Sequence, residues 1–370
     1  MLQKIAPPIE GPRMPVRPRV SMGIEVEFFA ICKPGYRITR KIVQPHEQVT
    51  EKGERFTVDE SVGTEYDSMV FHTVRQALFL LKSGLRKFIL KHYRYSKEPE
   101  IVSIAFLGGW RDRFAGSHFH IARGASGIQR RQASRLAEHI HDHIPFLIAL
   151  CANSPVWRGR ITKYASNRLL LGGEEYCYVT ERGTFDRDHY KEISYNYALK
   201  SKPPTLELRV CDSNIPEYLC SALVILKAIT LACLKGKRAS NICSHENYLS
   251  ARESAAKQGV KATLTWKDRK VSVPEYIDLF FGYYRKETEE MDIPDELFDV
   301  FKLLKLGFNG AEIVRRSCQS LRRTHPNAWK IYFGKKYTLA IEQLLNGETL
   351  EVFARQLGVR LPDTEEVKLG

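Results

Sequence analysis

The segment GIEVEFF, residues 23–29, decides the fold, because its alternation of apolar and polar side chains predicts a β-strand. Glu25 and Glu27 share one face of that strand, and the other face is apolar and can pack on a core. Two carboxylates one pleat apart repel each other, so they are stable either in water or around a shared cation. Taken alone, the segment is compatible with a solvated sheet face as well as with a cation site.

Two later segments repeat the same alternation. One places His118 and His120 on a single face, and the other does so with Glu207 and Arg209. The opposite face of each carries strong strand-forming residues. If the three strands belong to one sheet, its polar face combines carboxylates, imidazoles and a guanidinium, which favours a functional site over a solvated surface.

Two connecting segments carry further candidate ligands. The turn-rich acidic stretch DESVGTEYDS contains Asp59 and Glu65 as further cation ligands, although acidic turns are common. The Pro- and Gly-containing loop NSPVWRGR contains Trp157, Arg158 and Arg160. A loop of this composition is typical of anion binding, and the alternative is an ordinary helix exit.

Composition limits the class of protein. The chain has 370 residues and a net charge of +14, which suits either nucleic acid or a pocket for an anion such as a nucleoside triphosphate. The eight cysteines are scattered without a Cys-x-x-Cys pair, so they predict buried thiols and exclude a disulfide scaffold or a zinc site. No run of about 18 apolar residues occurs, so the sequence predicts no membrane span. The first residues lack an apolar signal region, so we expect a cytoplasmic protein.

Helical periodicity predicts the covering layer. Apolar spacing predicts helices over 69–93, 129–151 and 214–235, which we expect to pack on the outer face of the sheet. His139 and His143 have the i, i+4 spacing of a helical metal site, but no accompanying carboxylate motif is present, so we interpret them as structural or exposed. Further amphipathic helices are expected over 245–258, 274–289, 293–306, 310–323 and 336–357.

These patterns divide the chain into three parts. Residues 1–19 contain five prolines and predict an extended arm. Residues 20–235 hold the candidate site and its sheet, and residues 236–370 form a helical C-terminal region.

Four segments in order resemble one known family. GIEVEF, GSHFHI, CANSPVWRGRITKYAS and TLELRVCDS are similar to the glutamate–cysteine ligase type 2 (carboxylate–amine ligase) family of the glutamine synthetase-like superfamily. The resemblance covers about residues 20–235. It implies an α+β fold in which a curved antiparallel sheet forms a funnel with helices packed outside. It also implies ATP with Mg²⁺, or Mn²⁺ in its place, as cofactors.

The resemblance implies roles for individual residues. It makes Arg209 a phosphate-binding residue and His118 a metal-binding or phosphate-contacting one. The matching family segment brings Arg158 and Arg160 near the active site. We expect catalysis to involve His120, Arg158 and Arg209; nucleotide contacts to come from Trp157, His118, Arg160 and Arg209; and metal ligands to be Glu25, Glu27, Asp59, Glu65, His118 and Glu207.

The implied chemistry agrees with the residues. A carboxylate is a poor acyl donor, and phosphorylation gives it a good leaving group that an amine can displace. Cations must then bridge the mutually repelling ATP phosphates and carboxylate, and Arg209 can stabilise the transferred phosphoryl group. Glutamate, a related amino acid or a peptide are the expected substrates, with no membrane partner and with a homo-oligomer left open.

Two alternatives stay open at this point. GIEVEF also resembles the start of the Pup ligases, which join a protein tail to lysine, so a protein-modifying ligase or the reverse hydrolase is the second hypothesis. The third is a non-catalytic nucleic-acid-binding protein, supported by the net charge of +14 and a weak helix-turn-helix match at GETLEVFARQLGV. Paired carboxylates argue against the third, because without metal they repel phosphates.

Overall fold

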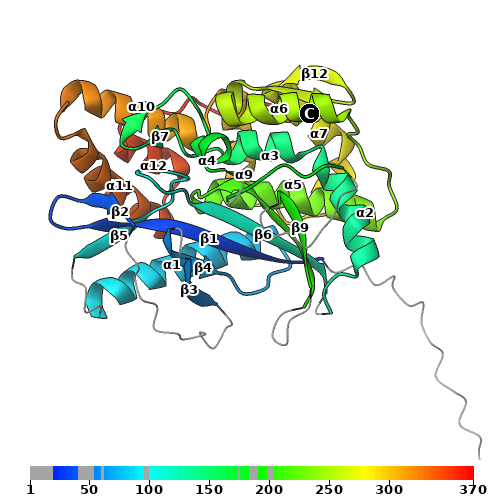
Figure 1. Cartoon of the computed structure of the whole chain (residues 1–370), viewed down its shortest axis with the longest axis horizontal. Helices are drawn as coiled ribbons and strands as arrows, with labels where there is room; N and C mark the ends of the chain where they lie inside the picture. Colours follow the sequence, from blue (N-terminus) through cyan, green and yellow to red (C-terminus); the bar gives the residue numbers. More distant parts are fainter. Residues whose placement is uncertain are drawn as a thin grey trace, which may run out of the picture.

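A curved antiparallel sheet forms the centre of the molecule, which we describe from a computed structural model (Figure 1). The structure describes residues 20–40, 54–59, 62–95, 100–124, 126–173, 176–182, 191–197 and 203–370. The predicted arm at 1–19 lies outside them. The main path of the sheet runs β3-β4-β1-β6-β10-β9, and β2 and β5 pair with the far end of β1. Its strands are β1 (Val20–Cys32), β2 (Arg37–Thr39), β3 (Arg55–Asp59), β4 (Gly63–Asp67), β5 (Ile101–Ala105), β6 (Gly116–Arg123), β9 (Ile193–Asn196) and β10 (Thr205–Asp212).

The register of the central strands places the predicted polar residues on one face. Glu25 on β1 lies opposite His118 on β6 and opposite Asp67 on β4. Glu207 on β10 lies opposite His120 on β6. Residues directly opposite each other in an antiparallel pair project from the same face. The expected arrangement, with the glutamates of β1 and β10 on one sheet face, is therefore confirmed.

Helices cover the apolar face of the sheet, as predicted. The α5 helix (Pro216–Leu234) contacts β1, α3 (Ile144–Cys151) contacts β10, and α2 (Arg130–His141) contacts β9 and β10. Val26 and Phe119, which project from this face, are fully buried. Burial of such side chains supplies the dominant favourable term in folding.

One helix has the length and composition of a membrane span. Among the described residues, only Pro216–Leu234 meets this description, and 89% of its apolar window is buried inside the fold. It contacts α1 (Val74–Tyr95) on one side and α9 (Asp295–Lys305) on another. The helix is thus covered by protein on several sides, as expected for a core helix.

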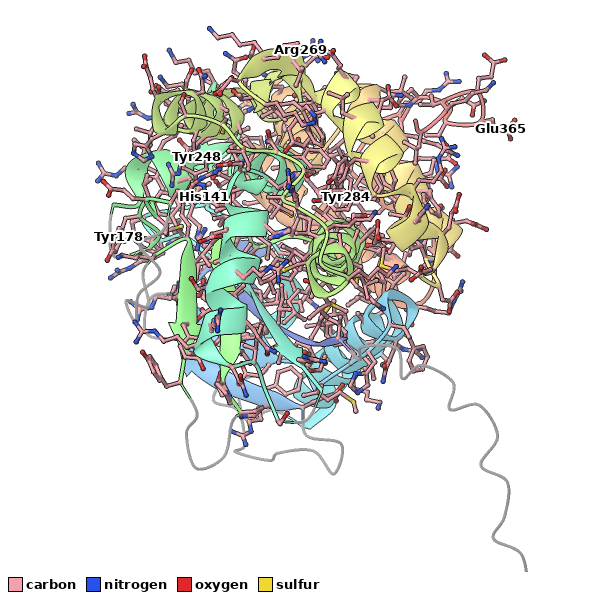
Figure 2. All side chains as sticks on the ribbon, turned by 90° about the vertical axis from the view of Figure 1, so that its right-hand side faces the viewer. His141, Tyr178, Tyr248, Arg269, Tyr284 and Glu365 are labelled. Carbon is pink, nitrogen blue, oxygen red and sulfur yellow. The ribbon has the colours of Figure 1, made fainter. Side chains whose placement is uncertain are left out.

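The C-terminal helices share this core. The α6 helix (His245–Gln258) packs on α3, and α11 (Trp329–Leu345) packs on β5 at the end of the sheet where β2 also lies (Figure 1). Figure 2 shows the side of the molecule where His141 stacks on Tyr248, with 4.1 Å between ring centroids. The remaining helices are α4 (Asn167–Leu171), η1 (Gly259–Lys261), α7 (Val273–Tyr283), α8 (Arg285–Glu289), α10 (Gly310–Thr324) and α12 (Leu350–Gln356).

Three expected helices are each divided in two. The helix expected over 129–151 is interrupted at Asp142 and His143, which cap α2 and α3. A proline at the start of α3 explains the break, since proline favours the first turn of a new helix. Those expected over 274–289 and 336–357 are divided at Tyr284 and around Asn346.

A short hairpin in the C-terminal part was not predicted. Its strands are β11 (Thr263–Trp266) and β12 (Arg269–Ser272), joined by Lys267 and Asp268, which both have positive φ. Turns of this kind match the twist of the flanking strands. A second separate hairpin, β7 (Val156–Trp157) with β8 (Arg160–Ile161), forms within the predicted loop.

Candidate functional site

The polar face of the sheet gathers the predicted site residues into one cluster. Adjacent strands supply them: β4, β1, β6 and β10 lie side by side in that order. Alternation along each strand places every second side chain on this face. We call these residues the polar cluster: Glu25, Glu27, Glu65, His118, His120, Glu207 and Arg209.

Two histidines lie between three of the glutamates. His118 Nδ1 is 3.4 Å from Glu25 Oε2 and 3.7 Å from Glu207 Oε1, and its Nε2 is 3.7 Å from Glu27 Oε1. His120 Nε2 is 3.2 Å from Glu25 Oε1. The carboxylates therefore converge on a common space instead of diverging into solvent.

The carboxylate of Glu207 is held from several directions. Arg209 Nη1 donates to Oε1 at 2.9 Å, and Asn196 Nδ2 donates to Oε2 at 2.7 Å. Ser194 Oγ donates to the same Oε2 at 3.4 Å. Sequence reasoning missed Ser194 and Asn196, although the alternation ISYN on β9 places both on one face.

Electrostatics lowers the pKa of two of the glutamates in the cluster. Burial raises the pKa of Glu25, but the charge of His120 and hydrogen bonds with His118 and His120 outweigh it and hold the pKa well below the usual range. Burial likewise raises the pKa of Glu207, and the neighbouring His120, His118 and Arg209 lower it further than burial raises it. Glu207 is buried and Glu25 is half-buried, and ionised carboxylates are acceptor-only groups, which suit a cation.

The geometry of the cluster fits one or more metal ions. Ligand atoms of Glu25, His120 and Glu207 all lie within 4.8 Å of one another, and so do those of Glu25, Glu65 and His118. Glu27 lies at the edge of these groups and accepts a hydrogen bond from the Gly116 backbone N–H at 2.6 Å. Carboxylate oxygens suit Mg²⁺, and the imidazoles broaden the set toward Mn²⁺.

The structure places other predicted residues elsewhere or leaves them undescribed. Asp59 ends β3, and its side chain lies outside the described part of the chain. Arg158 and Arg160 lie on the β7–β8 hairpin, where the Arg158 guanidinium carbon is 5.6 Å from the Trp157 ring centre. Trp157 stacks on Phe114 at 4.2 Å. In the part of the chain that the structure describes, no ion pair or hydrogen bond joins this hairpin to the polar cluster, so its predicted role remains a prediction.

Sequence reasoning missed three charged residues at or beside the polar cluster. Asp67 lies directly opposite Glu25, at the end of the acidic stretch that contains Asp59 and Glu65. Asp212 is buried at the end of β10 and accepts hydrogen bonds from Asn153 N–H at 2.8 Å and from Ser154 Oγ at 2.8 Å. Arg168 on α4 is also buried. Its position on a five-residue helix gave no periodic signal.

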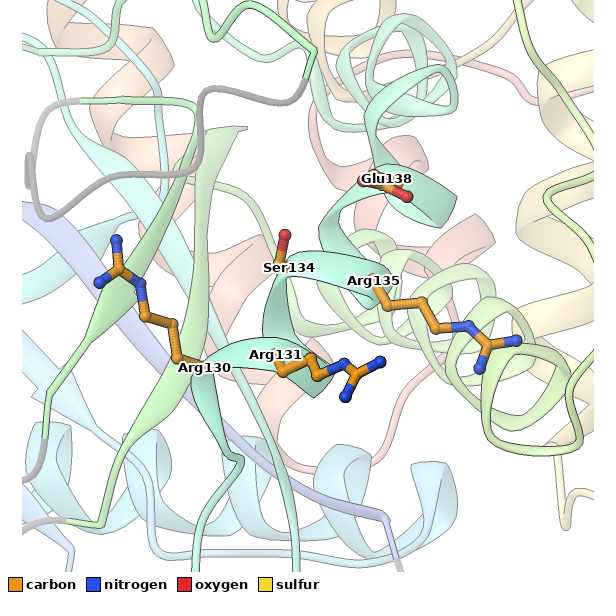
Figure 3. A pocket seen from close by; sticks show the side chains of 5 residues that line it. All are labelled: Arg130, Arg131, Ser134, Arg135 and Glu138. Atoms are coloured by element: carbon orange, nitrogen blue, oxygen red, sulfur yellow. The ribbon is translucent and has the colours of Figure 1, made fainter.

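A separate hollow lies on the outer surface of α2 (Figure 3). It measures about 590 Å³ and is lined by Arg130, Arg131, Ser134, Arg135 and Glu138. None of the polar-cluster residues lines this hollow.

Comparison with known proteins agrees with the fold and the resemblance. The model of a family described as "Glutamate-cysteine ligase family 2" matches residues 118–171. A "Putative glutamate--cysteine ligase 2" of Mycobacterium ulcerans is 32% identical over 129 residues, which are 30% of this chain and 31% of the relative. A protein of the same name from Mycobacterium tuberculosis is 32% identical over 130 residues, which are 30% of this chain and 33% of the relative. The chain thus matches about a third of the length of these relatives.

Two solved structures share the fold over most of the chain. The Pup ligase PafA, in its complex with the ubiquitin-like protein Pup, superposes with a TM-score of 0.57 at 13% identity and covers 94% of this chain and 81% of that one. A bifunctional glutathione synthetase from Pasteurella multocida gives a TM-score of 0.56 at 12% identity and covers 92% of this chain and 55% of that one.

The chain accordingly shares its fold with these two proteins, and the predicted α+β architecture with its curved antiparallel sheet is confirmed. The sequence resemblance is confirmed over part of the chain: residues 118–171 match the glutamate–cysteine ligase family 2 model, and relatives of that description align with about 30% of the chain.

Proposed function

We propose that the protein is an ATP-dependent carboxylate–amine ligase that forms an amide bond through an acyl-phosphate intermediate. The observation that carries the proposal is the convergence of Glu25, Glu27 and Glu207 around His118 on one face of the sheet. Three converging carboxylates, two of them buried, repel one another, and a bound cation would relieve that repulsion. Relatedness to glutamate–cysteine ligases gives independent support.

The charge balance of the cluster supports ATP as the phosphoryl donor. Four glutamates face one another here, and a nucleotide triphosphate adds more negative charge, so cations must lie between them. Glu25, Glu65, Glu207 and the two histidines would hold these ions, with Glu27 beside them. Bound Mg²⁺ would bring the phosphates near the acceptor carboxylate and withdraw charge from the transferred phosphoryl group.

Arg209 is the protein group that we assign to the transferred phosphoryl group. Its guanidinium projects from the polar face and is oriented by Glu207 at 2.9 Å. Burial lowers its pKa, but Glu207 and Glu27 raise it above the ordinary value, so the side chain stays charged throughout the reaction. A fixed positive charge stabilises negative charge that develops on the phosphoryl oxygens.

We propose glutamate, or a related amino acid or peptide, as the carboxylate substrate. The second candidate is a protein-modifying ligase or its reverse hydrolase, which is favoured by the fold shared with the Pup ligase over 94% of this chain. A cytoplasmic location is part of the proposal, supported by eight free and buried thiols and by the supply of ATP in that compartment.

Incubation with Mg-ATP and a mixture of candidate acids and amines tests the proposal. We expect ADP and phosphate release that requires both an acid and an amine, together with a new amide detected by mass spectrometry. Amide formation on a protein instead of a small molecule would favour the second candidate. Absence of any acid- and amine-dependent ADP formation, combined with strongly salt-dependent nucleic-acid binding, would favour the non-catalytic alternative.

A further inference from the structure

Arg168 is a buried arginine whose hydrogen bonding is incomplete. Its side chain lies on α4, and the residue is only 2% exposed. Nη2 donates to the Arg209 backbone carbonyl oxygen at 2.9 Å. Within the described part of the chain, Nε and Nη1 have no hydrogen-bond partner. A guanidinium remains charged under all ordinary conditions. Two buried donors without acceptors are therefore costly unless a ligand supplies the acceptors.

The guanidinium lies over the polar face of the sheet. Gly116, His118 and His120 alternate along β6 and so share that face. A Cβ atom built on Gly116 would lie 2.5 Å from Arg168 Nη2, 2.9 Å from Cζ and 3.1 Å from Nε. Arg168 therefore occupies the space that a side chain at Gly116 would fill, beside the carboxylates of the polar cluster.

The backbone of Gly116 links this position to the cluster. Its N–H donates to Glu27 Oε2 at 2.6 Å. The Arg209 carbonyl that accepts from Arg168 belongs to the residue whose side chain holds Glu207. Arg168 thus lies beside the backbone of two residues that hold Glu27 and Glu207, without forming an ion pair with either carboxylate.

Arg168 is held in place by a buried network. Its backbone N–H donates to Ser154 Oγ at 3.2 Å. The hydroxyls of Ser154 and Ser166 in turn donate to the Asp212 carboxylate at 2.8 and 2.9 Å. Fixed in this way, the charged group is preorganised, which reduces the entropy lost when a ligand binds.

We propose that Arg168 binds an oxyanion, a phosphoryl or a carboxylate group, on the polar face between Gly116 and the metal-binding carboxylates. The inference rests on the proposed function and extends it by a second cationic residue besides Arg209. The planar guanidinium matches the oxygen geometry of both groups, and an anion placed there is attracted by the bound cations and by Arg168 at once. Its source is either the nucleotide or the acid substrate.

Titration calorimetry of the full chain with inorganic phosphate in the presence of Mg²⁺ tests the site directly. We expect Arg168→Met to weaken phosphate binding at least about tenfold, and Arg168→Lys, which keeps the charge but loses the planar group, to weaken it less. Gly116→Ala should weaken it as well, because the new methyl group displaces the guanidinium while every charge is retained.

The matched control is Arg135→Met, which removes the same charge from the hollow on α2 (Figure 3). It separates specific binding from attraction by the net charge of +14, and phosphate affinity should stay at the wild-type value. Circular dichroism establishes which variants fold. Unchanged affinity in folded Arg168→Met would overturn the proposal, and Gly116→Ala decides in the same way if Arg168→Met does not fold. Absence of phosphate binding to the wild type would also overturn it.

A second arm identifies the source of the oxyanion. A loss of affinity for Mg-ATP but not for Mg-ADP would assign it to the terminal phosphoryl group, whereas a loss confined to L-glutamate would assign it to the substrate carboxylate. Both arms measure binding and need no turnover. If the protein binds phosphate through Arg168 but forms no amide, only the proposed function is contradicted. If the protein is an active ligase and substitutions of Arg168 leave its affinities for oxyanions unchanged, only this inference is contradicted.

Discussion

The carboxylate of Glu27 combines burial with a position beside the groups that we propose to bind metal. The residue is 6% exposed and lies close to His118 at 3.7 Å. In Glu27→Gln the volume is kept and one negative charge is lost. We expect the stability without metal to stay level or rise, because repulsion among the glutamates falls, while turnover drops by orders of magnitude. Thermal melts with and without Mg-ATP, beside a phosphate-release assay, measure both effects.

The stabilisation by Mg-ATP should shrink in the same variant, since a ligand stabilises only through its affinity for the folded state. Glu253→Gln is the matched control, because Glu253 is exposed on α6 and pairs only with the exposed Lys257 at 2.5 Å among the described residues. Full turnover and a full Mg-ATP shift in Glu27→Gln would remove this strand from the active site.

His143 predicts a pH dependence of stability that is unrelated to catalysis. Burial lowers its pKa from 6.5 to about 3. Between these values the unfolded chain binds a proton that the folded chain does not, so the free energy of unfolding rises with pH, by up to about 1.4 kcal/mol per pH unit, and levels off above pH 6.5. His139 and His141, whose pKa values burial also lowers, add to the same slope.

Urea unfolding of the wild type and of His143→Gln between pH 4 and pH 8 measures this dependence. The variant should lose part of the slope and keep the remainder. The same substitution at the exposed His245 serves as the control. A slope that is identical in the wild type and in His143→Gln would contradict the assignment of this proton to His143.

At the level of residues, the sequence predicts which side chains share a sheet face wherever apolar and polar residues alternate strictly. Glu25, His118 and Glu207 could be placed on one face because side chains alternate along strands. Arg168 could not be found in this way. Its burial over Gly116 arises from the packing of a short helix against a strand about fifty residues earlier in the chain, and no local pattern encodes such a contact.

Among the elements, α1 and α5 are joined by a buried ion pair. Lys82 Nζ on α1 lies 2.7 Å from Glu217 Oε1 in the first turn of α5, and Glu217 is 1% exposed. Lys82→Met should destabilise the fold by about 3–5 kcal/mol, because it leaves a buried carboxylate without its cation. Burial already raises the pKa of Glu217, so the loss should be larger at pH 8 than at pH 5.

A double-mutant cycle with Glu217→Gln isolates the pair. The double variant should be more stable than the sum of the two single effects predicts, as expected for groups in direct contact. If the effect of the double variant equals the sum of the two single effects, the pair contributes nothing of its own.

The β7–β8 hairpin carries a second prediction at this scale. Arg158 has a positive φ of 48° and lies at the turn, and Arg160 is exposed on β8. Arg158→Ala or Arg160→Ala should weaken the binding of ATP or of the acidic substrate severalfold and leave the melting temperature nearly unchanged. Equilibrium binding measurements decide, and unchanged affinities for both ligands would make the hairpin purely structural.

Element boundaries show where sequence reasoning stops. The apolar stripe through 129–151 continues across Asp142 and His143, so periodicity alone predicts one helix where the structure has two. Asp142 is buried, and its carboxylate contacts His141 Nδ1 at 2.7 Å and accepts a hydrogen bond from the backbone N–H of Cys243 at 3.1 Å. Cys243 lies over a hundred residues away in the chain. Pro145 marks the start of the second helix locally, but the stabilisation of Asp142 by so distant a partner has no local signature.

Across the whole molecule, the predicted ligase core and the C-terminal helices share one hydrophobic cluster. Trp110, within 20–235, stacks on Phe333 at 5.0 Å and meets Trp329 at 5.8 Å between ring centres. We therefore expect urea to unfold both regions in one transition. Far-ultraviolet circular dichroism and the fluorescence of variants that retain only Trp157 or only Trp266 should give the same midpoint. Separate midpoints would mean that the two regions unfold independently.

The composition of α5 has a consequence for the synthesis of the chain. Helices α1, α2 and α3 precede it, but α8 and α9, which also cover it, follow later in the sequence. While the ribosome is still translating the later part, only some of the helices that pack on this apolar nineteen-residue segment have been synthesised. The nascent chain thus exposes an apolar segment that membrane-targeting factors and chaperones can both recognise, until Lys305 at the end of α9 has left the exit tunnel.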